Sequence, residues 1–173
     1  MASVRASFLA PVCLVLGAVL GLAGTFMPSA AMRGLAWGVD GVVLVVAAAL
    51  LAVHYLRRGQ DAVAAGFLIF IAGQSLVVSG AAMSLEASAP SFAAGAALWS
   101  AALGLIGTSR TMPLLVRATG FVAAVLFAVM ALQVFSGHDL TPLSTPLPFF
   151  AYPFFVLTLF GWAWACVRPS GSS

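Results

Sequence analysis

Six apolar stretches, each long enough to cross a bilayer, fill most of this 173-residue chain. A transmembrane helix needs about 20 mostly apolar residues, and the expected spans cover residues 7–26, 35–56, 62–82, 91–108, 112–135 and 149–167. Only 6% of the residues are charged, whereas soluble domains carry about 25%. The sequence therefore predicts an all-α fold: a polytopic transmembrane helix bundle of six helices with short loops, in which residues 1–173 form a single integral membrane domain.

The distribution of arginines predicts the orientation of the bundle. Positive residues near the ends of spans are retained on the cytoplasmic side of the membrane. Only Arg33 falls on one side of the predicted bundle, and the other side carries Arg5, Arg57, Arg58, Arg110, Arg117 and Arg168. We therefore expect both termini to be cytoplasmic, in a multi-pass protein of a bacterial inner (cytoplasmic) membrane.

Small residues recur at helical spacing on three of the spans. Helices in lipid associate where small residues let their backbones approach. The three series are Gly17, Gly21 and Gly24; Gly66, Gly73 and Gly80; and Gly120, Ala124, Ala128 and Ala131. These series predict a compact bundle in the lipid bilayer, with contact to a second copy or to another membrane protein as the alternative.

Few residues could support catalysis or metal binding. No nucleophile and base pair is identifiable, and none of the common catalytic or phosphate-binding motifs occurs. The two histidines, His54 and His138, are far apart in sequence, and no basic stripe points to nucleic acid. We expect no enzymatic activity, no metal, no cofactor and no nucleic-acid partner.

Asp40 is the exception in this inventory, because it lies four or five residues inside the second predicted span. An ionisable group at that depth is costly and indicates a functional site by default. The structural alternative is that Asp40 sits near the positive end of its helix and pairs with Arg33, which can also lie over Trp37.

Most other polar residues of the spans fall in the half of the bundle that contains Asp40. These candidate ligand or ion contacts are Gln74, Ser75, Ser79 and Gln133. The helical face of Asp40 continues in the other direction through Leu44, Ala47 and Leu51. This pattern predicts a polar vestibule that is open to the outside and closed inward by an apolar plug.

A proline-rich segment with aromatic residues precedes the last span. Its prolines prevent helical hydrogen bonding, so the segment before Phe149 should be extended across the outer surface. The aromatic residues either anchor the last helix at the membrane interface or form an outer lid over the vestibule. The candidate lid residues are Pro146, Pro148, Phe149 and Tyr152.

Two function classes follow from these observations. The polar vestibule near Asp40 favours a small-solute or ion transporter or channel. The small-residue series and the scarcity of polar groups favour a structural or accessory subunit of a membrane complex.

Overall fold

The computed structural model describes residues 2–168, with side chains from residue 8 onward, and this part of the chain is all-helical. Six helices follow one another: α1 (Ala2–Thr25), α2 (Ala30–Leu56), α3 (Asp61–Ser79), α4 (Leu85–Thr108), α5 (Leu114–Phe135) and α6 (Ala151–Val167). Five of them, α1 to α5, are long and apolar enough to span a membrane, and α6 is an apolar helix of 17 residues. The predicted multi-pass helical membrane protein is confirmed at this level.

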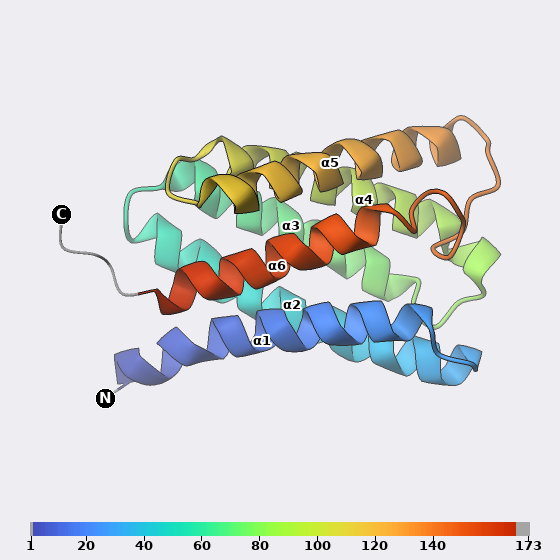
Figure 1. Ribbon diagram of the computed structural model, residues 1–173. Helices are drawn as coiled ribbons and strands as arrows, with labels where there is room; N and C mark the ends of the chain where they lie inside the picture. Colours follow the sequence, from blue (N-terminus) through green and yellow to red (C-terminus); the bar gives the residue numbers. More distant parts are fainter. Residues whose placement is uncertain (1, 169–173) are drawn as a thin grey trace.

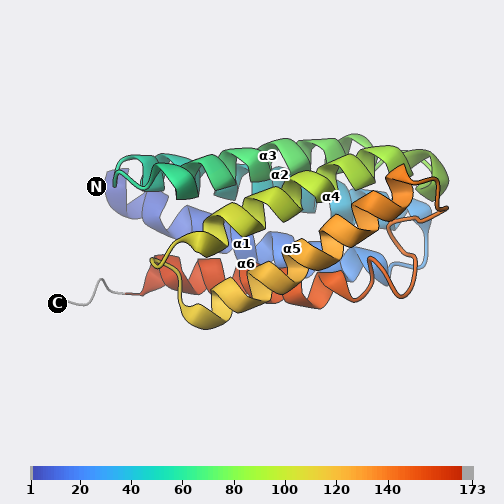
Figure 2. The ribbon, with the colours of Figure 1, turned by 90° about the horizontal axis from the view of Figure 1, so that it is seen from above.

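The six helices form a closed ring. Each helix packs antiparallel against its neighbour in sequence, and α6 packs against α1 (Figures 1 and 2). Within residues 2–168, no other pair of helices comes into close backbone contact. The outward face is apolar on most of the helices, with exposed residues such as Val12, Val42, Leu68, Val125 and Leu157.

Two helices begin earlier than the sequence analysis predicted, because serines cap them. The Ser29 side chain accepts a hydrogen bond from the Met32 amide, so α2 begins at Ala30 and not at residue 35. The Ser84 side chain accepts one from the Ala87 amide, so α4 begins at Leu85 and not at residue 91. Serine caps of this kind satisfy amide groups that a helix start leaves unpaired, and the resulting connections are shorter than expected.

Glycines allow the backbones of α3 and α4 to approach each other closely. A Cβ atom added to Gly73 would lie 2.8 Å from the Gly95 carbonyl oxygen, and one added to Gly95 would lie 2.7 Å from the Gly73 carbonyl oxygen. The two glycines therefore face each other at a distance that no other residue permits. Gly66 and Gly80 are also at contacts with α4, so this predicted series lies inside the bundle.

Aromatic side chains fill the interior of the ring. A run of neighbouring rings, here called the aromatic column, is formed by Tyr152, Phe127, Phe155, Phe70, Trp162, Phe67 and Tyr55. The centroids of successive rings lie between 4.9 Å (Phe67–Trp162) and 6.2 Å (Phe127–Tyr152) apart. The column runs from the first turn of α6 to the last turn of α2, so the interior is packed along most of its length.

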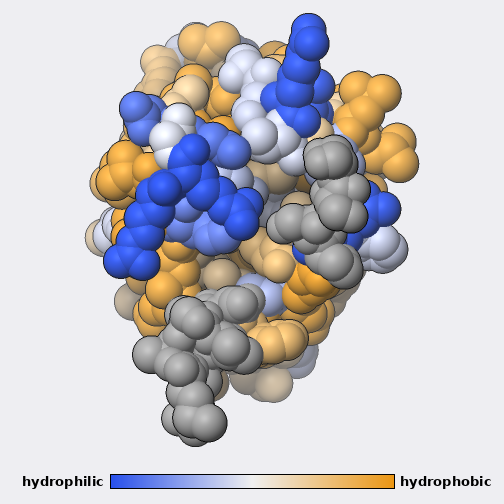
Figure 3. All heavy atoms as spheres, turned by 90° about the vertical axis from the view of Figure 1, so that its left-hand side faces the viewer, coloured by the Kyte–Doolittle hydropathy of each residue, from blue (hydrophilic) through white to orange (hydrophobic). Residues whose placement is uncertain are grey.

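Apart from Asp40, the charged residues with described side chains lie at the two ends of the bundle. One end, the arginine-rich end, carries the α2–α3 and α4–α5 connections, where α1 also begins and α6 also ends (Figure 1). Figure 3 views this end and shows hydrophilic residues within a rim of hydrophobic ones. Arg33, in the first turns of α2, lies at the opposite end, here called the Arg33 end.

The facing glycines lead to a stability prediction. Replacing Gly73 or Gly95 with alanine forces a Cβ atom against a backbone oxygen, so each change should lower the melting temperature in detergent. Gly104→Ala is the matched control, because its Cβ meets nothing within 4 Å and alanine is the better helix former.

Thermal unfolding of the three purified variants measures this difference. Equal melting temperatures for Gly73→Ala, Gly95→Ala and Gly104→Ala would mean that α3 and α4 are not in this contact.

Candidate functional site

The early start of α2 places Asp40 deep within its helix. Asp40 is the eleventh residue of a helix that begins at Ala30, so the helix dipole, which acts within about one turn of the terminus, does not stabilise its charge. The suggestion that Asp40 lies near the positive end of its helix was therefore wrong, because Ser29 extends the helix by more than a turn. The predicted face beyond Asp40 is confirmed, since Leu44, Ala47 and Leu51 are all buried.

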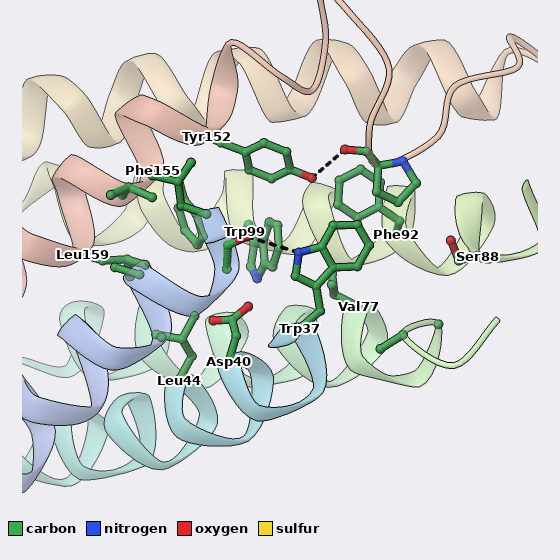
Figure 4. A pocket seen from close by; sticks show the side chains of 18 residues that line it. Trp37, Asp40, Leu44, Val77, Ser88, Phe92, Trp99, Tyr152, Phe155 and Leu159 are labelled. Atoms are coloured by element: carbon green, nitrogen blue, oxygen red, sulfur yellow. Dashed lines mark hydrogen bonds between the residues drawn. The ribbon is translucent and has the colours of Figure 1, made fainter. Parts of the chain in front are cut away.

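The Asp40 carboxyl group projects into a cavity between five of the six helices (Figure 4). The cavity has a volume of about 60 Å³, which corresponds to roughly four to six water positions. Its aromatic walls come from Trp37, Phe92, Trp99, Tyr152 and Phe155. The cavity lies toward the Arg33 end, and the aromatic column continues from it toward the arginine-rich end.

Glycines of α1 provide the space for the carboxyl group. A Cβ atom on Gly21 would lie 3.1 Å from Oδ2 of Asp40, and one on Gly17 would lie 3.2 Å from Oδ1. Gly21 also positions the indole of Trp37, whose Nε1 donates a hydrogen bond of 3.2 Å to the Gly21 carbonyl oxygen. Gly17 and Gly21 therefore form part of one wall of the cavity, and Gly24 lies against the Trp37 indole.

The segment before α6 reaches the cavity through one proline and one tyrosine. The Tyr152 hydroxyl donates a hydrogen bond of 2.9 Å to the Pro142 carbonyl oxygen, and both residues line the cavity (Figure 4). Of the candidate lid residues, only Tyr152 lines it; Pro146 and Phe149 are exposed, and Pro148 is buried elsewhere. The segment before α6 and the start of α6 therefore contact the cavity through Pro142 and Tyr152, and not through the other three candidate lid residues.

Most polar side chains around the cavity already donate hydrogen bonds to carbonyl oxygens of the protein. The Ser88 hydroxyl donates to the Leu85 carbonyl oxygen at 2.8 Å, and Trp37 and Tyr152 donate as described above. Two groups are not committed: Oδ1 of Asp40 and Nε1 of Trp99 are buried and have no hydrogen-bond partner among residues 2–168. Buried polar groups are nearly always paired with protein or with ordered water, so the cavity residues present one acceptor and one donor that a water or a ligand could pair with.

The other candidate polar residues do not join Asp40. Gln74 is buried at the contact of α3 with Gly41, and its Oε1 has no hydrogen-bond partner in the described chain. Ser75 and Ser79 are exposed and donate to carbonyl oxygens of their own helix. Gln133, near the end of α5, is half-buried outside the cavity. The structure therefore places all four outside the cavity lining.

Arg33 contacts the aromatic ring of Trp37, which lines the cavity. Its guanidinium carbon lies 5.8 Å from the centroid of the Trp37 ring, as the sequence suggested. Asp40 is two further turns along α2, about 10.5 Å in axial rise, and the free Oδ1 atom shows that Arg33 does not reach it.

Sequence reasoning identified Asp40 and Tyr152 but missed most of the walls. Phe92 and Phe155 resemble ordinary core residues in the sequence, and Pro142 resembles an ordinary loop residue. Only the closure of the ring, which brings α1 and α6 together, makes them neighbours. The one available signal was Trp99, which is too deep in its span for an interfacial tryptophan.

This geometry predicts that Arg33 and Asp40 act independently on stability. In a double-mutant cycle of Arg33→Gln and Asp40→Asn, the coupling should be below about 0.5 kcal/mol. The control cycle of Arg33→Gln and Trp37→Leu should give about 0.5–1 kcal/mol, as for an exposed cation–π contact. Chemical unfolding in detergent measures both coupling energies. A coupling above about 0.5 kcal/mol in the first cycle would support an ion pair between Arg33 and Asp40.

No protein-family model, curated protein or solved structure matches the chain. The function proposed below therefore rests on the geometry of the cavity and on the chemistry of its lining.

Proposed function

We propose that this protein is a membrane transporter for a small positively charged solute, which binds at Asp40. The observation that carries the proposal is the Asp40 carboxyl group, which faces a cavity while its buried Oδ1 has no partner in the described residues. Carboxyl groups inside membrane bundles are costly and typically mark a substrate or ion pathway. A cationic group would supply both the missing charge and the missing hydrogen bond.

The packed interior favours a transporter over an open channel. Beyond the cavity, the aromatic column occupies the ring, together with buried residues such as Leu51, Leu103 and Ile106. A solute at Asp40 could pass only if the helices moved, which is the behaviour of alternating access. The Tyr152–Pro142 hydrogen bond would be the contact that opens on the solute's entry side.

The proposed topology has six spans and both termini in the cytoplasm. Helix α6 lies beside both α1 and α5 in the ring, so it would share their environment despite its 17 residues. The arginine-rich end would be cytoplasmic and the Arg33 end outside. Such an arrangement fits a bacterial inner membrane and makes the cavity accessible from outside.

The alternative is an accessory subunit, and the surface of α4 is the observation that favours it. Between Leu85 and Thr108 no large apolar side chain is exposed, whereas the other helices expose several. Ala101 is exposed on this helix, and a Cβ atom on Gly104 would meet nothing. Small residues of this kind let another helix approach closely in lipid.

Reporter fusions test the topology. After Arg168, a reporter that works only in the cytoplasm should be active. At Asp139, a reporter that works only outside the cytoplasm should be active. Activity of a periplasm-only reporter at the first position would contradict the proposed orientation.

Flux through reconstituted vesicles tests transport. Wild-type protein should move charge when a gradient of a small ammonium ion is imposed, and Asp40→Asn should reduce this flux to the background of empty vesicles, because the amide keeps the shape and removes the charge. The matched control is Asp139→Asn, at an exposed position in the α5–α6 connection, which should transport as wild type. Wild-type flux from Asp40→Asn, or no flux of any cation by wild type, would favour the accessory role.

A further inference from the structure

We infer that the ligand of the cavity is a small alkylammonium ion, with an apolar body and a hydrogen-bond acceptor, and not an inorganic cation. This inference rests on the proposed function, because it names the substrate class of the same site. It follows from which groups of the lining are free, which are already used, and how much space they enclose.

The lining is poor in the oxygen ligands that inorganic cations require. Hard cations are typically surrounded by about six oxygen atoms. Within residues 2–168, no three His, Cys, Asp or Glu side chains gather in a way that could hold a metal ion. The carbonyl oxygens of Gly21 and Pro142 already accept hydrogen bonds from Trp37 and Tyr152, so Asp40 would be almost alone as a ligand.

The same lining suits an organic ammonium ion. Such an ion needs one carboxylate for its charge, and its alkyl groups are stabilised by apolar and aromatic walls. Five aromatic side chains and several aliphatic ones, including Leu22, Leu44 and Val156, surround Asp40. The cavity volume of about 60 Å³ corresponds to roughly four to six water positions, which suits an ion with about as many non-hydrogen atoms.

Trp99 adds a second recognition element. The residue is only 4% exposed, and its Nε1 has no hydrogen-bond partner among the described residues. Its ring is fixed by stacking on Phe155, with centroids 4.9 Å apart, and by an edge contact with Phe127 at 5.3 Å. A rigid N–H donor in the cavity favours a ligand that carries an acceptor, such as a hydroxyl group, beside its ammonium group.

Calorimetric binding to the full chain in nanodiscs tests the substrate class without requiring transport. The probes are ethylammonium, 2-hydroxyethylammonium, tetramethylammonium, sodium and potassium, with tert-butanol as a neutral molecule of similar size. The alkylammonium ions should bind and compete with one another, and 2-hydroxyethylammonium should bind most tightly. Sodium, potassium and tert-butanol should neither bind nor displace them.

Two variants locate the binding. Asp40→Asn should weaken alkylammonium binding by roughly thirtyfold or more, while Asp139→Asn should bind as wild type. Trp99→Phe retains the ring and removes the donor, so it should reduce the advantage of 2-hydroxyethylammonium over ethylammonium by about threefold to tenfold. The affinity for ethylammonium itself should change little.

The outcomes separate this inference from the proposed function. Displacement of the alkylammonium ions from wild-type protein by sodium or potassium, or unchanged binding by Asp40→Asn, would overturn the inference, and the displacement result does not depend on any variant folding. If Trp99→Phe kept the preference for 2-hydroxyethylammonium over ethylammonium, Trp99 would not recognise the acceptor of the ligand. Binding as expected, but with no flux in vesicles, would support the substrate class and refute transport.

Discussion

Close approach of neighbouring helices at glycine is the constraint on which both the bundle and its cavity depend. In lipid, helices gain little from burying apolar surface, so contact must come from close packing. At Gly73 and Gly95 two backbones meet directly, which ties α3 to α4. At Gly17 and Gly21 the missing side chains leave room for the Asp40 carboxyl group. The absence of a side chain at glycine thus brings two helices together in one place and makes room for a buried carboxyl group in another.

Much of the fold was predictable because lipid imposes a strong pattern on sequence. A span must be apolar over about 20 residues, so the number and order of the helices could be read directly. The helix starts were less predictable, since Ser29 and Ser84 cap their helices within stretches that look like polar loops. This shift changed the interpretation of Asp40, which lies far from the end of its helix.

The candidate site was predictable only in part, because membership in a cavity depends on which helices meet. Helical spacing correctly placed Asp40 on the same face of α2 as the buried Leu44. It could not show that Ser75 faces outward on α3, since a hydroxyl group bonded to its own helix, here to the Ile71 carbonyl oxygen, is tolerated in lipid. Nor could it show that Pro142 reaches the cavity, because the path of that segment depends on tertiary contacts.

The aromatic column also determines where the electrical potential across a membrane would fall. A dry, apolar barrier resists ions far more than a hydrated cavity, so most of the voltage should drop across the column between Phe155 and Tyr55. A cation held at Asp40 would then remain close to the potential of the side from which it came. In the proposed transport cycle, cation binding would be nearly independent of voltage, and almost the whole electrical work, about 2.3 kcal/mol per charge for each 100 mV, would belong to the later step that carries the cation past the column.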